Sequence, residues 1–338
     1  MTPKKKLMEQ VTALLTERGQ KALEIAKQSI LQEKIRSELL HEALRYFMEE
    51  VWEDVLHPAI LSLFCEAVGG DLDTTTQVGA AMVLLAGAAD VHDDIVDQSI
   101  TKDSQLTVFG KFGKDISILV GDALLFKGLM MLHEACETLP KEQKKAILEL
   151  AKQAFFGISS AEAEETSFRG KFDVSPEEYL DMIRTKVAVA EATAKIGVIL
   201  GGGTPQEVEE LGHYGRTLGI LMTIRDEFVD VFELDELKNR AEKECLPLPI
   251  LFTFKDPEKK DEIIQLLKAS TITEKEVDRI LDLVINSKET RMLKKEMRRM
   301  IKAEIQRLKF VGMESGERIK YKNILGFLLK STLEDLGR

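Results

Sequence analysis

The sequence places three carboxylates at the end of a strongly apolar stretch, AAMVLLAGAADVHDDIVD. On a helix, Asp93 and Asp97 are four residues apart and share one face, with Asp94 beside them. Like charges at this spacing destabilise a helix, and burying them beside apolar residues costs more, unless a cation bridges them. Oxygen-only ligands suit Mg²⁺. This first acidic cluster therefore predicts a magnesium site.

A second acidic cluster repeats the layout far downstream, where GILMTIRDEFVD ends in Asp226, Glu227 and Asp230. Either cluster alone could be an exposed acidic helix end, but two clusters on two apolar helices favour the two walls of one metal site. Mg²⁺ sites that use only one or two carboxylates per ion are commonly completed by substrate phosphates. The sequence therefore predicts a substrate that carries a diphosphate. Metal ions and nearby cations would neutralise the negative charge that builds on the diphosphate as it leaves.

Basic residues near the two clusters are candidates for holding that diphosphate. We take all six acids as metal ligands and the five aspartates as catalytic residues. Each basic candidate alone could also be an ordinary surface charge. The candidates are Lys102, Lys186, Arg225, and Lys238 or Lys243.

The elements that must position these residues are helices. The composition, 44% hydrophobic but only 6% aromatic, is rich in Leu, Ala, Glu and Lys, which favours helices. Apolar residues recur at helical spacing from end to end, and no strand is convincing. Ser175 and Thr204, each followed by Pro and by acids, predict helix starts. We expect an all-α fold with one domain over residues 1–338.

Turn residues predict where the helices end. No low-complexity linker separates two halves of the chain. From about Lys255 to Arg307 the charge pattern predicts solvated outer helices, and the basic run Lys294 to Arg299 is either a polyanion patch or, as we favour, a solvated helix face. The predicted breaks lie at 69–71, 110–113, 170–176, 201–205 and 247–249.

Composition also excludes several classes of function. A net charge of −11 with a pI near 5.2 argues against nucleic-acid binding. The three cysteines form no CxxC pair, which indicates neither a disulfide framework nor a zinc site. The N-terminus lacks the apolar core of a signal peptide, and the apolar stretches 80–89 and 116–125 are too short to span a bilayer. We expect a cytoplasmic protein, with peripheral membrane contact only through its product.

Several motifs together resemble the trans-isoprenyl diphosphate synthase family, also called polyprenyl synthetases. HDDIVD is similar to its first aspartate-rich motif and IRDEFVD to its second, with Phe112-Gly113 and VGDALLF between them. EEYLDMIRTK places Lys186 on the family's diphosphate-binding lysine, and LPLPIL resembles its TLP segment. The resemblance implies a bundle of long, mostly antiparallel helices around a central cavity, and usually a homodimer.

The resemblance also implies a mechanism. Three Mg²⁺ ions held by the two clusters would draw diphosphate from an allylic prenyl diphosphate and leave a carbocation in an apolar pocket. In ordinary members, isopentenyl diphosphate then attacks the cation and the chain grows by one five-carbon unit. Ala88 and Ala89 are small where short-product members place bulky residues, so a C20 or C25 diphosphate could fit, although tight helix packing explains them equally well.

The chain departs from the family before and after its first motif. The family's Gly-Lys-Arg-x-Arg-Pro string reads Glu53-Asp54-Val55-Leu56-His57-Pro58 here. A family histidine is replaced by Ala86, and Arg-Arg-Gly is replaced by Lys102-Asp103-Ser104. In the family, four of these cations hold the isopentenyl diphosphate. All four are replaced, two of them by the acids Asp54 and Asp103, which would repel a diphosphate.

The groups that serve the allylic diphosphate are mostly kept, with Lys102 as a conservative stand-in for arginine and Lys238 as a substitute for a lysine in a shortened segment. We therefore interpret the chain as a terpene synthase-like lyase or cyclase that ionises an allylic diphosphate without elongating it. Two alternatives stay open. One is a chain-elongating prenyltransferase with a reorganised set of cations, and the other is a non-catalytic regulatory subunit.

Overall fold

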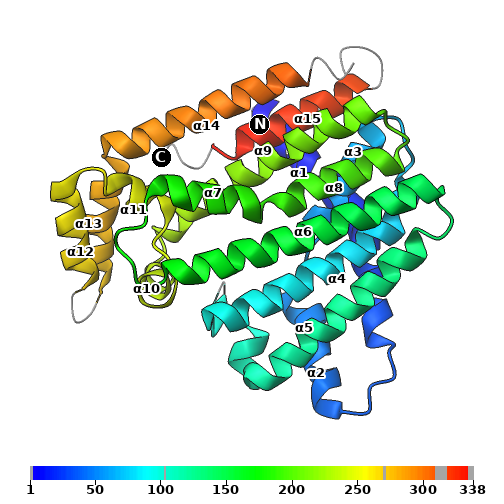
Figure 1. Cartoon of the computed structure of the whole chain (residues 1–338), viewed down its shortest axis with the longest axis horizontal. Helices are drawn as coiled ribbons and strands as arrows, with labels where there is room; N and C mark the ends of the chain where they lie inside the picture. The colour runs from blue at the N-terminus through cyan, green and yellow to red at the C-terminus, as the bar shows by residue number, and fades with distance from the viewer. Residues whose placement is uncertain (1–2, 103, 269–271, 309–317, 334–338) are drawn as a thin grey trace. The chain divides into compact units, whose positions relative to one another are not determined.

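The computed structural model describes residues 3–102, 104–268, 272–308 and 318–333 of the chain. The described residues are helical almost throughout, which confirms the all-α class (Figure 1). The exception is a short antiparallel pair of strands, β1 (Thr101–Lys102) and β2 (Gln105–Leu106), which the sequence did not predict. The chain divides into two compact units, Met1–Lys152 with Thr193–Leu211, and Gln153–Ala192 with Gly212–Arg338. The single-domain organisation stays a prediction.

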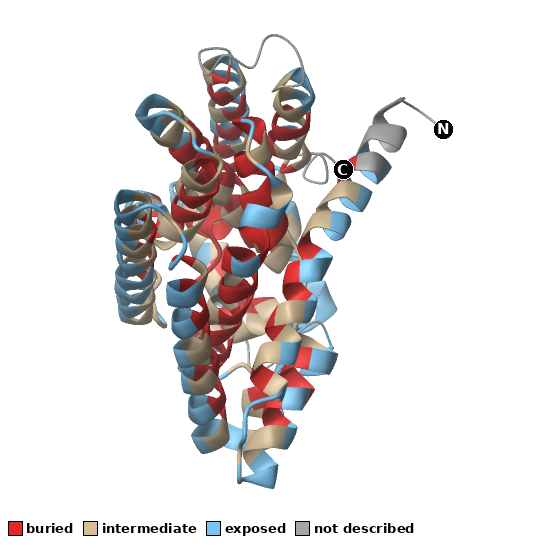
Figure 2. Cartoon of the chain, turned by 90° about the vertical axis from the view of Figure 1, so that its right-hand side faces the viewer, coloured by how far each residue is buried: buried red, intermediate tan, exposed pale blue. Residues whose placement is uncertain are grey.

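The first unit is built around α4 (Leu72–Asp97), which packs against α5 (Val108–Ala135), α3 (Leu56–Ala67) and α1 (Pro3–Leu31). Its core is contiguous and includes the fully buried Phe47, Leu84 and Leu124. Figure 2 shows helices with buried residues along one side and exposed residues along the other, which is the pattern that the helical spacing predicted. The remaining elements here are α2 (Glu38–Tyr46), a π-helix (Phe47–Val51) and the first part of α6 (Lys141–Phe168).

In the second unit, α11 (Leu248–Thr253) packs against α7 (Pro176–Lys186), α13 (Glu274–Ile285) and α14 (Lys288–Arg307). The fully buried Tyr214 ties α9 to α15, because its hydroxyl donates a 2.7 Å hydrogen bond to the carbonyl of Leu325. α8 (Ala188–Leu200) begins in the second unit and ends in the first, and α9 (Pro205–Asp230) begins in the first and ends in the second. The further helices of the second unit are α10 (Leu234–Lys243), α12 (Pro257–Leu267) and α15 (Arg318–Ser331).

Helix ends largely follow the turn residues of the sequence. Ser175 caps α7 in a capping box with Glu178, and Thr204 accepts a hydrogen bond from the backbone N–H of Glu207 at the start of α9, so both predicted starts are confirmed. The break predicted at 110–113 is a kink inside α5, where Gly113 has φ 77° and ψ 171°. Only glycine adopts that conformation without strain, so the kink depends on Gly113.

By length and composition alone, α5 is the one helix of the described residues that could cross a membrane, and 39% of its most apolar window is buried. It is longer than the apolar stretch 116–125 that the sequence suggested. Core helices of soluble proteins meet the same criterion, and α5 packs along α4.

We expect the three cysteine thiols to be unreactive in the folded protein. Cys65, Cys136 and Cys245 are all buried and free. Burial raises the pKa of Cys245 to about 12 against the opposing charge of Arg240. Because the thiolate is the nucleophile, iodoacetamide at about pH 8 should leave Cys245 unmodified in the native protein and alkylate it in urea. Mass spectrometry of the peptides measures this, and native labelling as fast as that of free cysteine would contradict it.

Candidate active site

The first acidic cluster lies in the last two turns of α4. Asp71 caps the start of α4, because its side chain accepts a hydrogen bond from the backbone N–H of Asp73, and Gln98 follows the last residue with a left-handed φ of 56°. The C-terminal end of a helix carries negative partial charge, so acids there are unfavourable without a cation. Asp93, Asp94 and Asp97 therefore occupy the end of α4 that least tolerates them.

Burial further raises the free-energy cost of the negative charges in the first cluster. Asp94 is only 6% exposed, and burial followed by repulsion from Asp90 raises the pKa of Asp94 to about 8, although Lys102 opposes this. The Oδ1 atom of Asp93 is buried and accepts no hydrogen bond from the described residues. A buried carboxylate oxygen without a donor is costly unless a cation or water meets it. These side chains therefore fit a bound divalent cation.

A pocket of about 370 Å³ opens beside this cluster, within the first unit. Its charged lining residues include Asp90, Asp94 and Lys102, and its apolar lining residues include Trp52, Val55 and Leu106. The remaining lining residues are Val51, Glu53, Asp54, Leu56, Gln105 and Thr107. The pocket combines acids, a cation and an apolar wall, as a site for metal ions and a prenyl diphosphate requires.

Lys102 reaches the pocket because the β1–β2 hairpin holds it there. Ser104, with φ 64°, forms the turn, and the hydroxyl of Tyr46 donates a 2.7 Å hydrogen bond to the carbonyl of Leu106. Lys102 Nζ lies 2.6 Å from Asp90 Oδ1, so Lys102 is already paired with an acid. Sequence reasoning missed Asp90, although its four-residue spacing from Asp94 could have revealed it. Asp103 lies outside the described residues.

The second acidic cluster ends α9, in the second unit. Asp226 is exposed and lies 3.4 Å from Arg225 Nη1, whereas Asp230 is half-buried. Burial raises the pKa of Asp230 to about 7, against the opposing charge of Arg240. Asp226 and Asp230 are one helical turn apart and therefore share a face, as the sequence predicted.

Glu227 is engaged differently from its two neighbours. It is buried, and its Oε1 accepts hydrogen bonds from Tyr179 Oη at 2.9 Å and Arg240 Nη2 at 2.8 Å. Its Oε2 accepts a 2.7 Å hydrogen bond from the backbone N–H of Leu248, in the LPLPIL segment. Both oxygens are thus held by the protein, so Glu227 fixes the end of α9 against α7, α10 and α11. Its role as a metal ligand stays a prediction.

Arg240 is the buried cation of this region, and sequence reasoning overlooked it. Besides Glu227 it lies 3.4 Å from Glu244, 3.9 Å from Asp230 and 4.0 Å from Glu165. Lys238, which the sequence analysis predicted as a diphosphate-binding cation, lies two residues before Arg240 and is half-buried. Within the described residues it forms none of the ion pairs around the second cluster. The only sequence signal for Arg240 is its place on the apolar face of α10, three residues after Leu237.

Lys186, the other candidate cation of the second unit, stands between two acids of α6. Its Nζ lies 2.8 Å from Glu162 and 2.9 Å from Glu165. Together with Arg240 it forms a chain of alternating charges that runs from α6 to Glu227. A diphosphate would compete with these carboxylates for Lys186.

Ala88 and Ala89 differ in their surroundings. Ala88 is 1% exposed and belongs to the core cluster of the first unit, so close helix packing accounts for its small size. Ala89 is half-buried. Of these two alanines, only Ala89 is accessible enough to contact a substrate.

Glu165 gives this charge chain a measurable pH dependence. Burial works to raise the pKa of Glu165, but Lys186 and Arg240 outweigh it, so the pKa is lowered. A lowered pKa stabilises the fold above the ordinary carboxyl range and loses this stabilisation in acid. Glu165→Gln should therefore cost about 1–3 kcal/mol of unfolding free energy near pH 7, and progressively less as the pH falls below the ordinary carboxyl range and through the lowered pKa of Glu165. Urea titrations across this pH range test this, with Glu177→Gln at an exposed ion pair as control.

Within the described residues, no three His, Cys, Asp or Glu side chains already converge as a metal-binding set. Mg²⁺ commonly takes only one or two protein carboxylates and completes its shell with water and phosphate oxygens. Asp93 Oδ1 is buried without a hydrogen-bond donor, and the pKa values of Asp94 and Asp230 are raised. Both properties fit carboxylates that bind a metal ion. Asp93, Asp94 and Asp97 in one unit, and Asp226 and Asp230 in the other, are the side chains that would hold such ions.

Comparison with known proteins identifies the family. The polyprenyl synthetase family model matches residues 37–284. The chain belongs to the polyprenyl synthetase family. It is 34% identical, over 54% of its length, to a short chain isoprenyl diphosphate synthase of Methanothermobacter thermautotrophicus, and 29% identical, over 66%, to a geranylgeranyl diphosphate synthase of Sulfolobus acidocaldarius. The matches span 55% and 65% of those relatives.

Solved structures of polyprenyl synthetases share the fold over nearly the whole chain. A geranylgeranyl pyrophosphate synthetase from Pyrococcus horikoshii matches with a TM-score of 0.84 and 25% identity, over 97% of this chain and 99% of that one. A geranylgeranyl pyrophosphate synthetase from Geoglobus acetivorans matches with a TM-score of 0.80. Members of this family are Mg²⁺-dependent enzymes that bind allylic prenyl diphosphates.

These relatives overturn the lyase interpretation. They are named as prenyl diphosphate synthases, which elongate a chain, rather than as terpene synthases. The interpretation failed because it treated Asp54 as a free repelling charge. Asp54 Oδ1 instead accepts hydrogen bonds from the backbone N–H groups of Leu56 and His57 at the start of α3, both at 3.1 Å. Its Oδ2 lies 3.0 Å from His57 Nδ1, so its charge is locally paired.

Proposed function

We propose that this protein is a chain-elongating trans-prenyltransferase, which joins an allylic prenyl diphosphate to isopentenyl diphosphate. The proposal rests on the first acidic cluster at the end of α4, from which Asp94 lines a pocket together with Asp90 and Lys102. Such a cluster at the C-terminal end of a helix costs stability, and a metal-diphosphate complex is a ligand that offsets this cost. The names of the relatives support elongation as the outcome.

In this reaction the carbon–oxygen bond of the allylic diphosphate breaks and diphosphate leaves with the bonding electrons. The double bond of isopentenyl diphosphate attacks the allylic cation, a new carbon–carbon bond forms, and a proton is lost from the isopentenyl unit. Bound Mg²⁺, which we propose as three ions, would supply the positive charge that stabilises the departing diphosphate. Lys102 would leave Asp90 to bind the oxygens of this diphosphate. In the second unit, Lys186 and Arg225 stay predicted diphosphate-binding residues.

The isopentenyl diphosphate needs cations other than those of ordinary members. His57 is a candidate, because it directly follows the pocket-lining residues Asp54 to Leu56 in the chain and its side chain is 40% exposed. Burial works against a charged ring, but the hydrogen bond and charge of Asp54 outweigh it, so the pKa of His57 is raised. We propose that His57 contributes positive charge for the isopentenyl diphosphate. In that case Asp54 strengthens binding indirectly by keeping His57 protonated.

We also propose a homodimer through the exposed face of α5. Leu119, Phe126, Leu129 and Met130 recur at helical spacing on that face and are between 43% and 69% exposed. Such a row of exposed apolar side chains is typical of an interface. The cytoplasmic location and membrane contact through the product stay predictions.

Product analysis tests the proposed function. The purified protein is incubated with Mg²⁺, isopentenyl diphosphate and allylic diphosphates of five to twenty carbons, and the products are identified by mass. We expect longer prenyl diphosphates, with a twenty-carbon product first because of the relatives' names. A hydrocarbon or alcohol formed without isopentenyl diphosphate would refute elongation. Turnover only after a complete homologue is added would indicate a regulatory subunit.

A further inference from the structure

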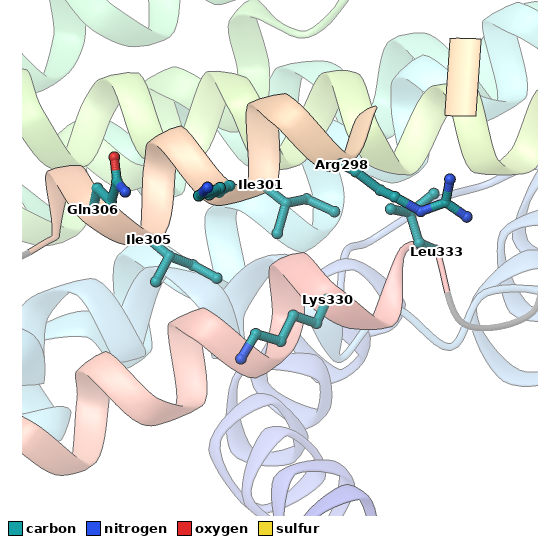
Figure 3. A pocket seen from close by; sticks show the side chains of 7 residues that line it. Arg298, Ile301, Ile305, Gln306, Lys330 and Leu333 are labelled. Carbon is teal, nitrogen blue, oxygen red and sulfur yellow. The ribbon is translucent and has the colours of Figure 1, made fainter. Parts of the chain in front are cut away.

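A second hollow, of about 460 Å³, lies between α14 and α15 in the second unit (Figure 3). None of the acidic-cluster residues lines it. Figure 3 shows Ile301 and Ile305 on α14 and Lys330 on α15, with Arg298 close to Leu333. The described residues that line it are Arg298, Ile301, Lys302, Ile305, Gln306, Lys330 and Leu333.

The lining combines an apolar floor with a cationic rim. Ile301 is 7% exposed, and Ile305 and Leu333 are half-buried. Arg298, Lys302 and Lys330 are exposed, and the lining contains no carboxylate among the residues that the structure describes. Among the described residues none of these three cations forms an ion pair, whereas the adjacent Arg299 is paired with Glu296 at 2.7 Å.

The surrounding helices concentrate positive charge within an acidic protein. α14 carries eight basic and three acidic residues, and α15 carries four basic residues and no acidic one. The whole chain has a net charge of −11, so this charge is local. Three unpaired cations around one hollow repel one another, and an anion bound among them would relieve that repulsion.

We propose that this hollow binds a single-chain anionic amphiphile, namely a phosphate or diphosphate monoester of an isoprenoid or alkyl alcohol. The guanidinium and two ammonium groups match a phosphate with several charged oxygens. Ile301, Ile305 and Leu333 match the first part of an apolar chain. The volume is within the range of about 300–1,000 Å³ that is usual for small-molecule sites. This site is independent of the proposed catalytic activity.

Calorimetry with decyl phosphate in EDTA tests the proposal, because this probe has no allylic bond to ionise and no Mg²⁺ is present. We expect binding to the wild type and to an Asp93→Ala/Asp97→Ala chain alike. Lys302→Gln/Lys330→Gln should weaken binding by about tenfold, equivalent to about 1.4 kcal/mol. Ile305→Asn should also weaken it. Lys295→Gln is the matched control on the exposed part of α14 outside the hollow, and it should leave binding unchanged.

Three results would overturn the proposal. Inorganic phosphate binding as tightly as decyl phosphate would show a simple anion patch. Binding to phosphatidylglycerol vesicles but not to monomeric decyl phosphate would show a membrane surface. An equal loss in Lys295→Gln would show that general charge, rather than the hollow, governs binding. Melting temperatures of all variants confirm that each is folded before binding is measured.

Discussion

Replacing both Asp93 and Asp97 with alanine is expected to lower kcat/KM by at least about a thousandfold, because metal-assisted charge stabilisation is worth several kcal/mol. The same change should raise the melting temperature of the metal-free protein. It removes two like charges from the C-terminal end of α4 and a buried carboxylate oxygen without a donor. Activity is measured by steady-state kinetics and stability by thermal unfolding in EDTA.

The matched control is Asp73→Ala, at the opposite end of the same helix. Asp73 is exposed, and its one ion pair within the described part of the chain is with Lys21, at 3.3 Å. Its loss should leave kcat/KM nearly unchanged. If the double variant kept its activity, the first cluster would not be the metal site. If it lost both activity and stability, the carboxylates would be structural.

Arg240→Met is expected to have the largest effect on stability, a loss of about 3–5 kcal/mol of unfolding free energy. The side chain is 9% exposed, and its removal leaves the buried Glu227 without a compensating charge. Asp230 and Glu244 would also lose their ion pairs with Arg240. Urea denaturation measures the loss, and the chain should recover part of it when Glu227→Gln is added, because the pair is coupled.

Arg279→Met, in the same unit, is the control for this second prediction. Arg279 forms a 2.6 Å ion pair with Glu262 but is exposed, so its loss should not change the unfolding curve measurably. If Arg240→Met were as mild as Arg279→Met, the charge chain around Glu227 would not hold the second cluster in place.

Residues close together in the sequence were predicted well. The i,i+4 acids of HDDIVD and IRDEFVD and the capped start of α7 depend on local spacing. The break predicted at 110–113 depends on one residue's conformational freedom, and in the structure it is a kink within α5 at Gly113. These features follow from helix geometry alone.

Features that depend on distant partners could not be predicted. Arg240 gains its role from Glu165 and Glu227, which approach it only when three helices pack. Lys102 is positioned by a two-residue strand pair too short to leave a sequence signature. The charge of Asp54 was misjudged for a similar reason. Comparing residue types with the family motif position by position does not show that the backbone N–H groups at the start of α3 and the side chain of His57 contact Asp54.

Elongation requires that isopentenyl diphosphate captures the allylic cation. This capture is tested by following labelled isopentenyl diphosphate and released diphosphate in the same reaction with an allylic substrate and Mg²⁺. We expect one diphosphate to be released for each isopentenyl unit incorporated, and none when isopentenyl diphosphate is omitted. Diphosphate release at the same rate without isopentenyl diphosphate, with no label in the product, would contradict it.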